Sequence, residues 1–573
     1  MRPRILILLA MTAPILEPLE LAGQSDGLPV PGRSVVATTR GIVATSHPLA
    51  SAAGVQILDA GGNAIDAAIA ANAAMGVMEP TGNGIGGDLF AIVYLAESNE
   101  VIGLNASGWA PAALTPAFLA EQDIDEMPAR GVHTVTVPGV VAGWHSLRAR
   151  YGRLTFERIL EPAIHYAEDG FPLSPVTAGL WARSERMLSS HPHMESAFLI
   201  DGRTPRAGEV FRRPELATSL RRIAEGGRDG FYRGPTARAI LAILGEHGGV
   251  MSAEDLAEYQ PEWVEPISTH YRGWTVYEIP PNGQGIAALM MLDLMERFPI
   301  GDYGFHSVDA LHVMIEAKKL AYADMVRYVG DPRFAEVPVE AMLNTAHAAE
   351  RAERILMRRA ACSVDPSEFP GVTDRDGGDT IYLTVIDEAG NIVSLIQSNY
   401  SGFGSGIVAE GTGFMLHNRG ALFTLEEGHP NVLAGRKRPL HTIIPAFMER
   451  DGVRIGFGIM GGWNQAQAHA QFVSNIVDHG MDIQQALEAG RFTKGTFDGC
   501  DVSIESLVPE SIRQQLERRG HDLQVVAPRS SVFGYGQAVM STPAGVHFGA
   551  SEPRHDGMAI PQGPPKGSSE GQR

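Results

Sequence analysis

The junction between Asp379 and Thr380 offers a recognisable piece of chemistry. Thr380 opens a run of β-branched and aromatic residues, directly after a polar, glycine-rich stretch that ends in Gly377-Gly378-Asp379. If the chain were cut before Thr380, the new α-amine could serve as the base that activates the hydroxyl of the same residue for nucleophilic attack. The other interpretation is that Thr380 is the first residue of an ordinary strand. The local pattern leaves both interpretations open.

Other catalytic patterns in the sequence are weaker. Gly82-Asn-Gly84-Ile-Gly-Gly87 matches G-x-G-x-x-G, but a nucleotide loop needs a strand before it and a helix after it, and here the expected order is reversed. We therefore expect a glycine-rich loop that packs closely on another backbone. Gly402-Phe-Gly-Ser-Gly406 does not form a G-x-S-x-G elbow, and no H-E-x-x-H motif or Cys/His ligand spacing indicates a metal site.

The elements that would position Thr380 are predicted to change character at this junction. Residues 360–379 have loop composition and separate a mostly helical region, about 138–329, from a β-patterned one. The runs 380–386 and 392–398 flank a turn and predict a β-hairpin, as do 34–39 and 41–45. Such mixed patterns indicate an α/β or α+β layered fold. Further helices are predicted over 49–58, 64–78, 307–327, 465–478, 483–489 and 509–519, and further strands over 89–95, 101–104, 406–408, 413–416, 454–459 and 524–526.

The composition excludes several classes of protein. The 573 residues are 44% hydrophobic, which allows a large core and excludes a wholly disordered chain. Asp and Glu number 66 against 46 Lys and Arg, and the resulting net charge of −20 argues against nucleic acid as a partner. The two cysteines, Cys362 and Cys500, are too few for a disulfide scaffold or a Cys-rich metal cluster. One disulfide remains possible, although nothing in the sequence supports it.

The two ends of the chain stand apart from the rest. Two arginines and an apolar run over residues 5–16 resemble the start of a secretory signal, but Glu17, Pro18 and Glu20 follow where a small-residue cleavage site would stand. We expect residues 1–33 to be a signal or a disordered segment. If residues 1–22 are a signal the protein is periplasmic or secreted, and otherwise it is cytoplasmic. No stretch is long enough for a membrane span, and the tail 561–573 is expected to be disordered.

A series of short motifs runs in order from about Gly41 to Ala559. The motifs are Gly61-Gly-Asn-Ala-Ile-Asp-Ala-Ala68, Gly84-Ile-Gly-Gly-Asp88, Val137-Pro-Gly-Val-Val-Ala-Gly-Trp144, Gly230-Phe-Tyr-Arg-Gly234, Pro280-Pro-Asn-Gly-Gln-Gly285, Ile315-Glu-Ala-Lys-Lys-Leu-Ala-Tyr-Ala-Asp324, Gly330-Asp-Pro332, Asp379-Thr380, Lys437-Arg-Pro-Leu440, Gly461-Gly462 and Glu552-Pro-Arg-His-Asp-Gly557. In this order they resemble the γ-glutamyltransferase family of N-terminal-nucleophile hydrolases.

The resemblance implies an α+β fold, a four-layer αββα sandwich built from two subunits of one precursor. The precursor would cleave itself between Asp379 and Thr380. Residues 34–379 would form the large subunit and residues 380–573 the small one, and the two would stay associated. No metal or organic cofactor is implied.

The resemblance also assigns catalytic roles. Thr380 would be the nucleophile that forms an acyl-enzyme ester, and Ser398 falls where the family has a second hydroxyl beside it. Gly461 and Gly462 fall where two backbone N–H groups form the oxyanion hole. Glycine suits that place because the substrate must approach the backbone closely.

The positions that bind substrate in the family carry different residues here. The arginine that holds the glutamyl α-carboxylate corresponds to Ser107, and no arginine lies in 101–120. We expect Arg419 to be a new cation at the rim of the site, able to bind a carboxylate from the other side. The replaced positions are Ser107, Tyr400, Arg419, Leu422, His441 and Thr442.

These departures favour a particular branch of the family. Residues 398–407 and 418–420 resemble cephalosporin (glutaryl) acylases and oxamate amidohydrolases. We predict an amidohydrolase or acylase for a small-molecule amide, such as a glutaryl or dicarboxylic monoamide compound, with low transpeptidase activity on glutathione-type donors.

Three alternatives stay open at this point. A true γ-glutamyltransferase or glutathione hydrolase for γ-glutamyl-type substrates would rebuild the carboxylate clamp with Arg419 or Arg130. A non-catalytic family member would never cleave its chain. A periplasmic solute-binding protein fits the length but not the motifs.

Overall fold

The computed structural model describes residues 28, 31–365 and 379–564. The predicted signal-like segment 1–22 falls outside these ranges, as do residues 366–378 of the predicted linker and residues 565–573 of the predicted tail. Of Asp379 only the backbone is described, as the first residue of a strand. No helix in the described ranges has both the length and the apolar character that a membrane span requires.

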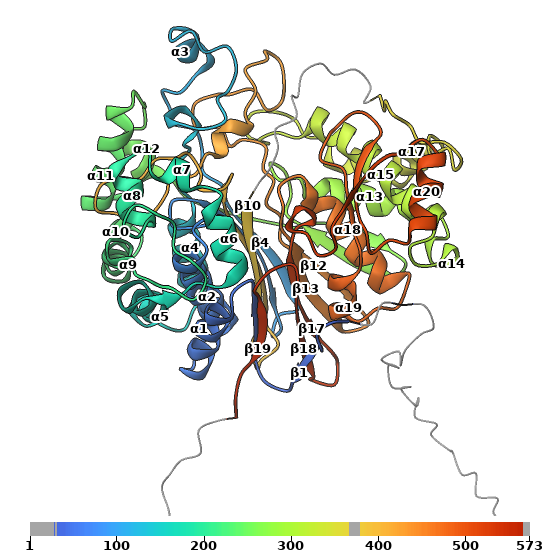
Figure 1. Ribbon diagram of the computed structural model, residues 1–573, viewed down its shortest axis with the longest axis horizontal. Coiled ribbons are helices and arrows are strands. Elements are labelled where there is room, and N and C mark those ends of the chain that lie inside the picture. Colours follow the sequence, from blue (N-terminus) through green and yellow to red (C-terminus); the bar gives the residue numbers. More distant parts are fainter. Residues whose placement is uncertain (1–27, 29–30, 366–378, 565–573) are drawn as a thin grey trace, which may run out of the picture.

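Two seven-stranded sheets lie face to face at the centre of the molecule (Figure 1). Neighbouring strands are antiparallel throughout both sheets. The first sheet contains, in spatial order, β19 (Met558–Pro561), β2 (Ile42–Thr45), β10 (Asp379–Ile386), β11 (Ile392–Tyr400), β3 (Asp88–Leu95), β4 (Glu100–Ala106) and β7 (Glu262–Val264). The second contains β1 (Val36–Thr38), β18 (His547–Ser551), β17 (Gly536–Ser541), β13 (Val453–Ile459), β12 (Ala446–Arg450), β9 (Trp274–Glu278) and β8 (Ile267–Tyr271).

Helices cover the outer face of each sheet, which completes the four layers (Figure 1). The layer on the first sheet includes α1 (Pro48–Asp59), α2 (Ala64–Met78), α4 (Val140–Tyr151), α5 (Phe156–Asp169) and α9 (Pro214–Gly226). The layer on the second includes α13 (Gly285–Met295), α15 (Val308–Tyr328), α18 (Asn464–Val477) and α19 (Ile483–Glu488). The α+β sandwich implied by the family resemblance is therefore confirmed.

Shorter elements surround these layers. The helices are α3 (Pro116–Ala120), α6 (Pro175–Ala182), α7 (Glu185–Leu188), α8 (Pro192–Phe198), α10 (Asp229–Tyr232), α11 (Gly234–Glu246), α12 (Ala253–Glu258), α14 (Ile300–Tyr303), α16 (Val339–Met342), α17 (Thr345–Ala352), α20 (Glu510–Arg518) and the 3-10 turns Val132–Thr134, Arg419–Leu422 and Ser531–Phe533. The strands are β5 (Phe171–Pro172), β6 (Val210–Phe211), β14 (Phe492–Thr493), β15 (Asp501–Glu505) and β16 (Asp522–Val526).

Helix α2 shows how the sequence sets one of these layers. All its residues are buried, and its many alanines let the helix lie close to β10 and β11. Asn63 caps its N-terminus and Asp66 returns the bond to the Asn63 N–H, so the first turn is satisfied. Asn72 Nδ2 donates to Gln397 Oε1 at 2.8 Å, which fixes β11 one residue before Ser398.

Several strand predictions meet different outcomes. The hairpin over 380–398 is confirmed, because β10 and β11 pair antiparallel. The hairpin over 34–45 is wrong, because β1 pairs with β18 in one sheet and β2 with β10 and β19 in the other. The strands over 406–408 and 413–416 reduce to a single bridge between Val408 and Met415. Alternating patterns identified strands but not the partners that distant residues supply.

Cys362 and Cys500 form a disulfide, with their Cα atoms 4.5 Å apart and 138 residues between them along the chain. Cys362 follows the last described helices before residue 365, and Cys500 directly precedes β15. The Gly499 N–H also donates to the Cys362 carbonyl at 2.7 Å. This bond ties the chain ahead of Thr380 to the chain beyond it. Two cysteines so far apart in sequence gave no signal of their pairing.

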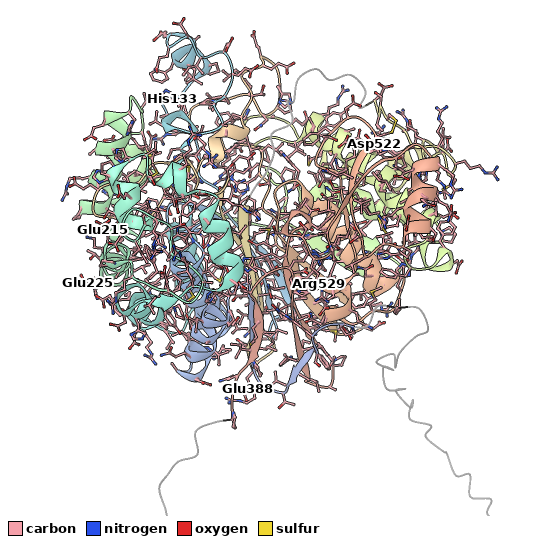
Figure 2. All side chains as sticks on the ribbon, in the orientation of Figure 1. His133, Glu215, Glu225, Glu388, Asp522 and Arg529 are labelled. Atoms are coloured by element: carbon pink, nitrogen blue, oxygen red, sulfur yellow. A yellow bond between two sulfur atoms is a disulfide. The ribbon has the colours of Figure 1, made fainter. Side chains whose placement is uncertain are left out.

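Surface charges such as Glu225, Glu388 and Asp522 are exposed at separate places on the outside of the molecule (Figure 2). Charges in such places keep their hydration and cost little. Buried charges are a different matter, because they lose that hydration and need a partner. The largest departure from the surface pattern near Thr380 is the pair formed by Asp88 and Arg419, both fully buried.

Candidate active site

Thr380 lies on β10, at the centre of the first sheet, and its side chain is fully buried. Its Oγ1 donates a hydrogen bond to Ser398 Oγ, 3.1 Å away on the neighbouring strand β11. Ser398 Oγ also accepts from the backbone N–H of Tyr400 at 2.7 Å. Beside Thr380 the register shifts, so that β11 has one residue more than β10. Such a bulge re-aims side chains, and here the two predicted hydroxyls meet.

Gly461 and Gly462 follow the end of β13 in the facing sheet. Their φ angles are +125° and +57°, a region that favours glycine. Neither N–H donates to an acceptor among the residues that the structure describes, whereas the Gly462 carbonyl accepts from Gln284 Nε2 at 2.8 Å. The two sheets approach closely here, since a Cβ on Gly458 would lie 2.5 Å from the Tyr382 ring. Two N–H donors without acceptors can bind the oxyanion of a tetrahedral intermediate.

A cavity of about 400 Å³ adjoins both groups. Tyr400, the backbone partner of Asp379, forms one wall, and Trp463, which follows Gly462, forms another. Thr380, Ser398, Gly461 and Gly462 are not themselves among the lining residues, so the cavity borders them through their neighbours Tyr400 and Trp463. It is lined by Asp125, Glu126, Met127, Val326, Tyr400, Ala421, Leu422, Phe423, Thr424, Leu425, Glu426, His429, Asn431, Leu440 and Trp463.

A buried charge cluster lies directly beside Ser398, because Asp88 is its register partner on β3. Arg419 donates from Nε to Asp88 Oδ2 at 2.8 Å and from Nη2 to Oδ1 at 3.2 Å, a two-point contact. Its Nη1 donates to Thr442 Oγ1 at 2.7 Å. His441 Nε2 lies 2.8 Å from Asp88 Oδ2. These four side chains form the Asp88 cluster, and all are buried.

The protonation of the Asp88 cluster follows from these contacts. Burial alone would raise the pKa of Asp88, but Arg419 and then His441 outweigh it and hold the pKa well below its usual range. Burial, followed by the charge of Arg419, lowers the pKa of His441 to about 4. His441 Nδ1 accepts from the Ile443 N–H at 3.3 Å, so Nε2 carries the proton that faces Asp88. At neutral pH Asp88 and Arg419 therefore form an ion pair beside a neutral His441 imidazole, and His417 Nδ1 also faces Asp88 Oδ2, at 3.3 Å.

Arg419 is thus not the rim cation that the sequence led us to expect. The side chain has no exposed surface, and its guanidinium is neutralised by Asp88 and stacked 4.8 Å from the Tyr400 ring. The prediction was wrong because the partner, Asp88, lies 331 residues away and is placed beside it only by the sheet. No free cation at this position can meet a substrate carboxylate.

Ser107, at the position of the family's arginine, is also fully buried. Its Oγ accepts from Asn282 Nδ2 at 3.3 Å, and its carbonyl accepts from Arg438 Nε and from Tyr259 Oη, each at 3.1 Å. Ser107 does not line the cavity, whereas Tyr400 does. Of the six replaced positions, Arg419, His441 and Thr442 come together in the Asp88 cluster, Tyr400 packs on it, and Leu422 lines the cavity.

Asp88 is the residue of this site that sequence reasoning missed. It ends the glycine-rich motif Gly84–Asp88, to which we assigned no chemistry. The prediction that this loop packs on another backbone is confirmed, since a Cβ on Gly86 would lie 2.1 Å from the Met415 carbonyl and one on Gly87 would lie 2.3 Å from the Ser398 carbonyl. An acid directly after such a loop was the available signal.

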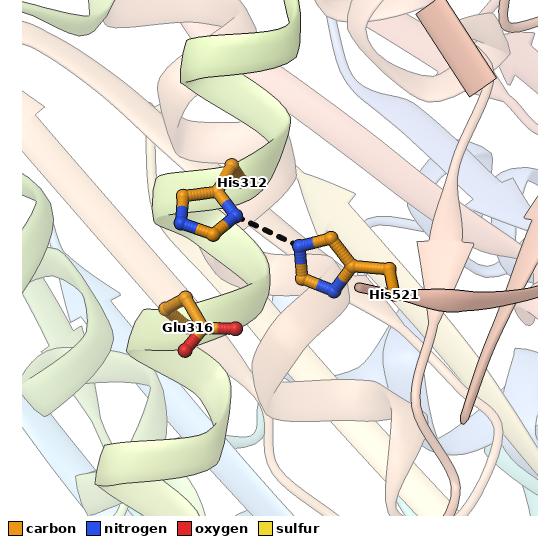
Figure 3. A group of neighbouring side chains, drawn as sticks. All are labelled: His312, Glu316 and His521. Carbon is orange, nitrogen blue, oxygen red and sulfur yellow. Dashed lines mark hydrogen bonds between the residues drawn. The ribbon is translucent and has the colours of Figure 1, made fainter. Parts of the chain in front are cut away.

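A second buried cluster, of His312, Glu316 and His521, has the residue types of a metal site (Figure 3). Its groups already bond one another and their neighbours. His312 Nδ1 lies 2.8 Å from His521 Nε2, and Glu316 accepts from Lys319 Nζ at 2.7 Å and from the Ala361 N–H at 3.0 Å. Burial, followed by the charge of Lys319, lowers the pKa of His521 to about 3. The positive charge of Lys319 beside the cluster disfavours a metal ion. The contact between His312 and His521 instead fastens α15 to the chain after α20.

Comparison with known proteins agrees with this geometry. The gamma-glutamyltranspeptidase family profile matches residues 50–562. The chain is 36% identical to the glutathione hydrolase-like YwrD proenzyme of Bacillus subtilis, over 92% of this chain and 99% of that protein, and 34% identical to the oxamate amidohydrolase proenzyme of Klebsiella pneumoniae, over 91% and 98%. The crystal structure of cephalosporin acylase from Bacillus halodurans superimposes with a TM-score of 0.87 at 43% identity, covering 94% of this chain and 98% of that one. The chain therefore belongs to the γ-glutamyltranspeptidase family and is an amide hydrolase of the N-terminal-nucleophile class.

Proposed function

We propose that the protein is a self-processing amidohydrolase or acylase whose nucleophile is released by cleavage between Asp379 and Thr380. The observation that carries the proposal is the 3.1 Å hydrogen bond from Thr380 Oγ1 to Ser398 Oγ beside a cavity. Gly461 and Gly462 supply the oxyanion donors. Residues 34–379 form the large subunit and residues 380–573 the small one.

The sheet topology supports lasting association of the two subunits. In the first sheet, β10 lies between β2 and β11, and β11 lies between β10 and β3. Strands from before and after residue 380 are therefore neighbours in one sheet, and a cut between Asp379 and Thr380 separates only the first residue of β10, the partner of Tyr400, from the rest of that strand. The two subunits share one core and have no separate folded halves.

The mechanism follows from the positions of these groups. The free α-amine of Thr380 takes the proton from Oγ1, which attacks the carbonyl carbon of the substrate amide. The N–H groups of Gly461 and Gly462 stabilise the negative charge on the carbonyl oxygen. The C–N bond then breaks, the leaving amine takes the proton, and an ester to Thr380 remains. Water hydrolyses this ester by the same route, with the α-amine again accepting and returning the proton.

The specificity side of the proposal rests on what replaces the glutamyl clamp. Ser107 stands in place of the arginine, and the guanidinium of Arg419 is already bound to Asp88 through two hydrogen bonds. The likeness to a cephalosporin acylase and an oxamate amidohydrolase supports amide hydrolysis outside the γ-glutamyl class. We therefore place the enzyme among the acylases and amidohydrolases of the family.

A second candidate function is glutathione hydrolysis or γ-glutamyl transfer, which the name of the B. subtilis relative favours. It needs a cation for the glutamyl α-carboxylate. With Arg419 bound to Asp88, Arg130 is the remaining candidate that the sequence raised, and its Nη1 donates to the Gly404 carbonyl. This candidate therefore requires Arg130 to exchange a backbone contact for the substrate.

Turnover of γ-glutamyl donors separates the two functions. Glutathione and γ-glutamyl-p-nitroanilide are compared with p-nitroanilides whose acyl group lacks the α-amino and α-carboxylate groups, and acyl adducts are sought by mass spectrometry on the small subunit. We expect turnover of the simple anilides, an adduct on Thr380 and low turnover of the γ-glutamyl donors. High turnover of glutathione would exclude the acylase assignment, and processed protein that turns over none of these amides would exclude both functions.

A further inference from the structure

The charge of the cavity indicates the class of substrate. Apolar side chains form about half of its walls, with Met127, Phe423 and Leu440 buried and the ring of Trp463 partly open. Three carboxylates, Asp125, Glu126 and Glu426, also line it, and all three are exposed. Among its lining residues in the described parts of the chain there is no lysine or arginine. A partly apolar cavity whose exposed side is acidic attracts cations and repels anions.

Arg419, a buried cation that packs on a wall of the cavity, does not offset the negative charge of the exposed carboxylates. Arg419 packs on the Tyr400 ring, a wall of the cavity, but is not itself part of the lining. Its charge is matched by Asp88 through two hydrogen bonds, and a third bond goes to Thr442. A substrate carboxylate would have to displace Asp88, which is buried in the sheet beside Ser398.

We propose that the cavity takes an apolar group that ends in a neutral or cationic function, and that it discriminates against a terminal carboxylate. The group lies on one side of the scissile amide, as the acyl part or as the leaving amine. This inference rests on the proposed amide hydrolysis at Thr380 and narrows its substrates. It departs from the glutaryl and dicarboxylic substrates that the sequence led us to expect, because those required a free Arg419.

Two substrate series of matched length test the inference in the processed enzyme. The acyl series consists of the p-nitroanilides of hexanoic, 6-aminohexanoic and adipic acids. The amine series consists of the acetamides of hexylamine, 1,6-diaminohexane and 6-aminohexanoic acid. We expect kcat/KM for the neutral and cationic members to exceed that for the anionic member at least tenfold in one series. An anionic member that is equal or better in both series would overturn the proposal.

A charge reversal at the cavity sharpens the test. Glu426→Lys should reduce the preference against the carboxylate several-fold, whereas Glu427→Lys should leave it unchanged, because Glu427 is exposed but does not line the cavity. An equal effect of the two variants would assign the preference to the overall charge of −20 and overturn the role of the cavity.

Binding without turnover separates this inference from the proposed function. Hexanamide, 6-aminohexanamide and adipamic acid are titrated into the Thr380→Ala variant, which retains the cavity as an intact chain. Weaker binding of adipamic acid than of the other two supports the inference even if no substrate is hydrolysed. Absence of hydrolysis by processed enzyme excludes the proposed function, whereas equal or tighter binding of adipamic acid excludes only the substrate class.

Discussion

The four residues assigned to catalysis, which we call the frame, and the Asp88 cluster beside them are held in place in different ways. Thr380, Ser398, Gly461 and Gly462 are held by strand pairing, a bulge and positive φ angles, so the backbone sets their geometry. The Asp88 cluster depends on side chains, since Asp88 and Arg419 neutralise one another's charge inside the first sheet. A frame fixed by the backbone tolerates exchange of the side chains next to it. One family can therefore keep its chemistry while it changes its substrate.

The largest effect on stability is expected when the Asp88 cluster loses its negative charge. Asp88→Asn leaves the guanidinium of Arg419 buried without a counter-charge, and we expect unfolding to become easier by about 3–5 kcal/mol. Arg419→Gln in the same chain should recover part of the loss. Chemical denaturation measures both. Arg233→Gln, at an exposed pair with Asp229, is the control, expected to change stability by under about 1 kcal/mol. If Asp88→Asn lowers the free energy of unfolding no more than this control does, Asp88 is not the counter-charge that stabilises the buried Arg419.

A change in the frame should affect catalysis more than stability. Gly461→Ala places a side chain at φ +125° beside Asn464 and shifts an oxyanion donor, for which we expect a fall in kcat of about 10²–10³-fold. Gly520→Ala, at φ +100° with only an ordinary contact to Ala360, also places an alanine outside the left-handed region that L residues can adopt, but away from the site. Steady-state kinetics should separate them. Similar kcat values for the two variants would count against the oxyanion role.

The disulfide offers a way to test how the two subunits are joined. If the chain is cut before Thr380, the bond from Cys362 to Cys500 links the large subunit to the small one. Non-reducing gels should show one species, and reducing gels two. Cys500→Ser should give two species on both gels and lower the stability by about 2–4 kcal/mol. Two species from unreduced wild type, or two alkylatable thiols before reduction, would show that the bond does not form.

The smallest effect concerns pH. His441 has a pKa of about 4 in the folded chain against an ordinary 6.5, so the folded state binds fewer protons than the unfolded one between these values. Its stabilising contribution is present above pH 6.5 and is lost as the pH falls toward 4, by up to about 3 kcal/mol. Denaturation between pH 7 and 4.5 measures the slope, to which His521 and other buried histidines with lowered pKa values also contribute, and His441→Gln should make it shallower by up to one proton without removing it. Parallel profiles for the variant and wild type would show that another group controls the slope.

Local patterns predicted most of the elements that carry the frame. The apolar run after Asp379 predicted β10, and the alanine-rich run over 64–78 predicted α2 with the bounds that the structure has. Motif order placed Thr380, Ser398, Gly461 and Gly462 in one site, and their surroundings fit that assignment. These features depend on neighbouring residues or on backbone geometry that glycine signals directly.

The Asp88 cluster and the disulfide could not be predicted from local patterns. The partners of Arg419 and of Cys362 lie 331 and 138 residues away along the chain, and only the sheet packing brings them together. The sequence showed that a cation had replaced the family's residue, but not that Asp88 neutralises it. Burial and pairing of charges are properties of the fold as a whole.

The state of the chain at Thr380 tests the central claim most directly. Intact masses under denaturing, reducing conditions are compared for wild type, Thr380→Ala and Thr384→Ser, a buried threonine on the same strand. The whole chain of 573 residues has a mass of 61.4 kDa, and 379 of these residues lie ahead of the cut. Wild type and Thr384→Ser should therefore give fragments of about 41 and 21 kDa, the larger one lighter if the N-terminus has been removed. Thr380→Ala should remain one chain. A single uncut mass for wild type would contradict the account, because Thr380 would then never gain the amine that its chemistry requires.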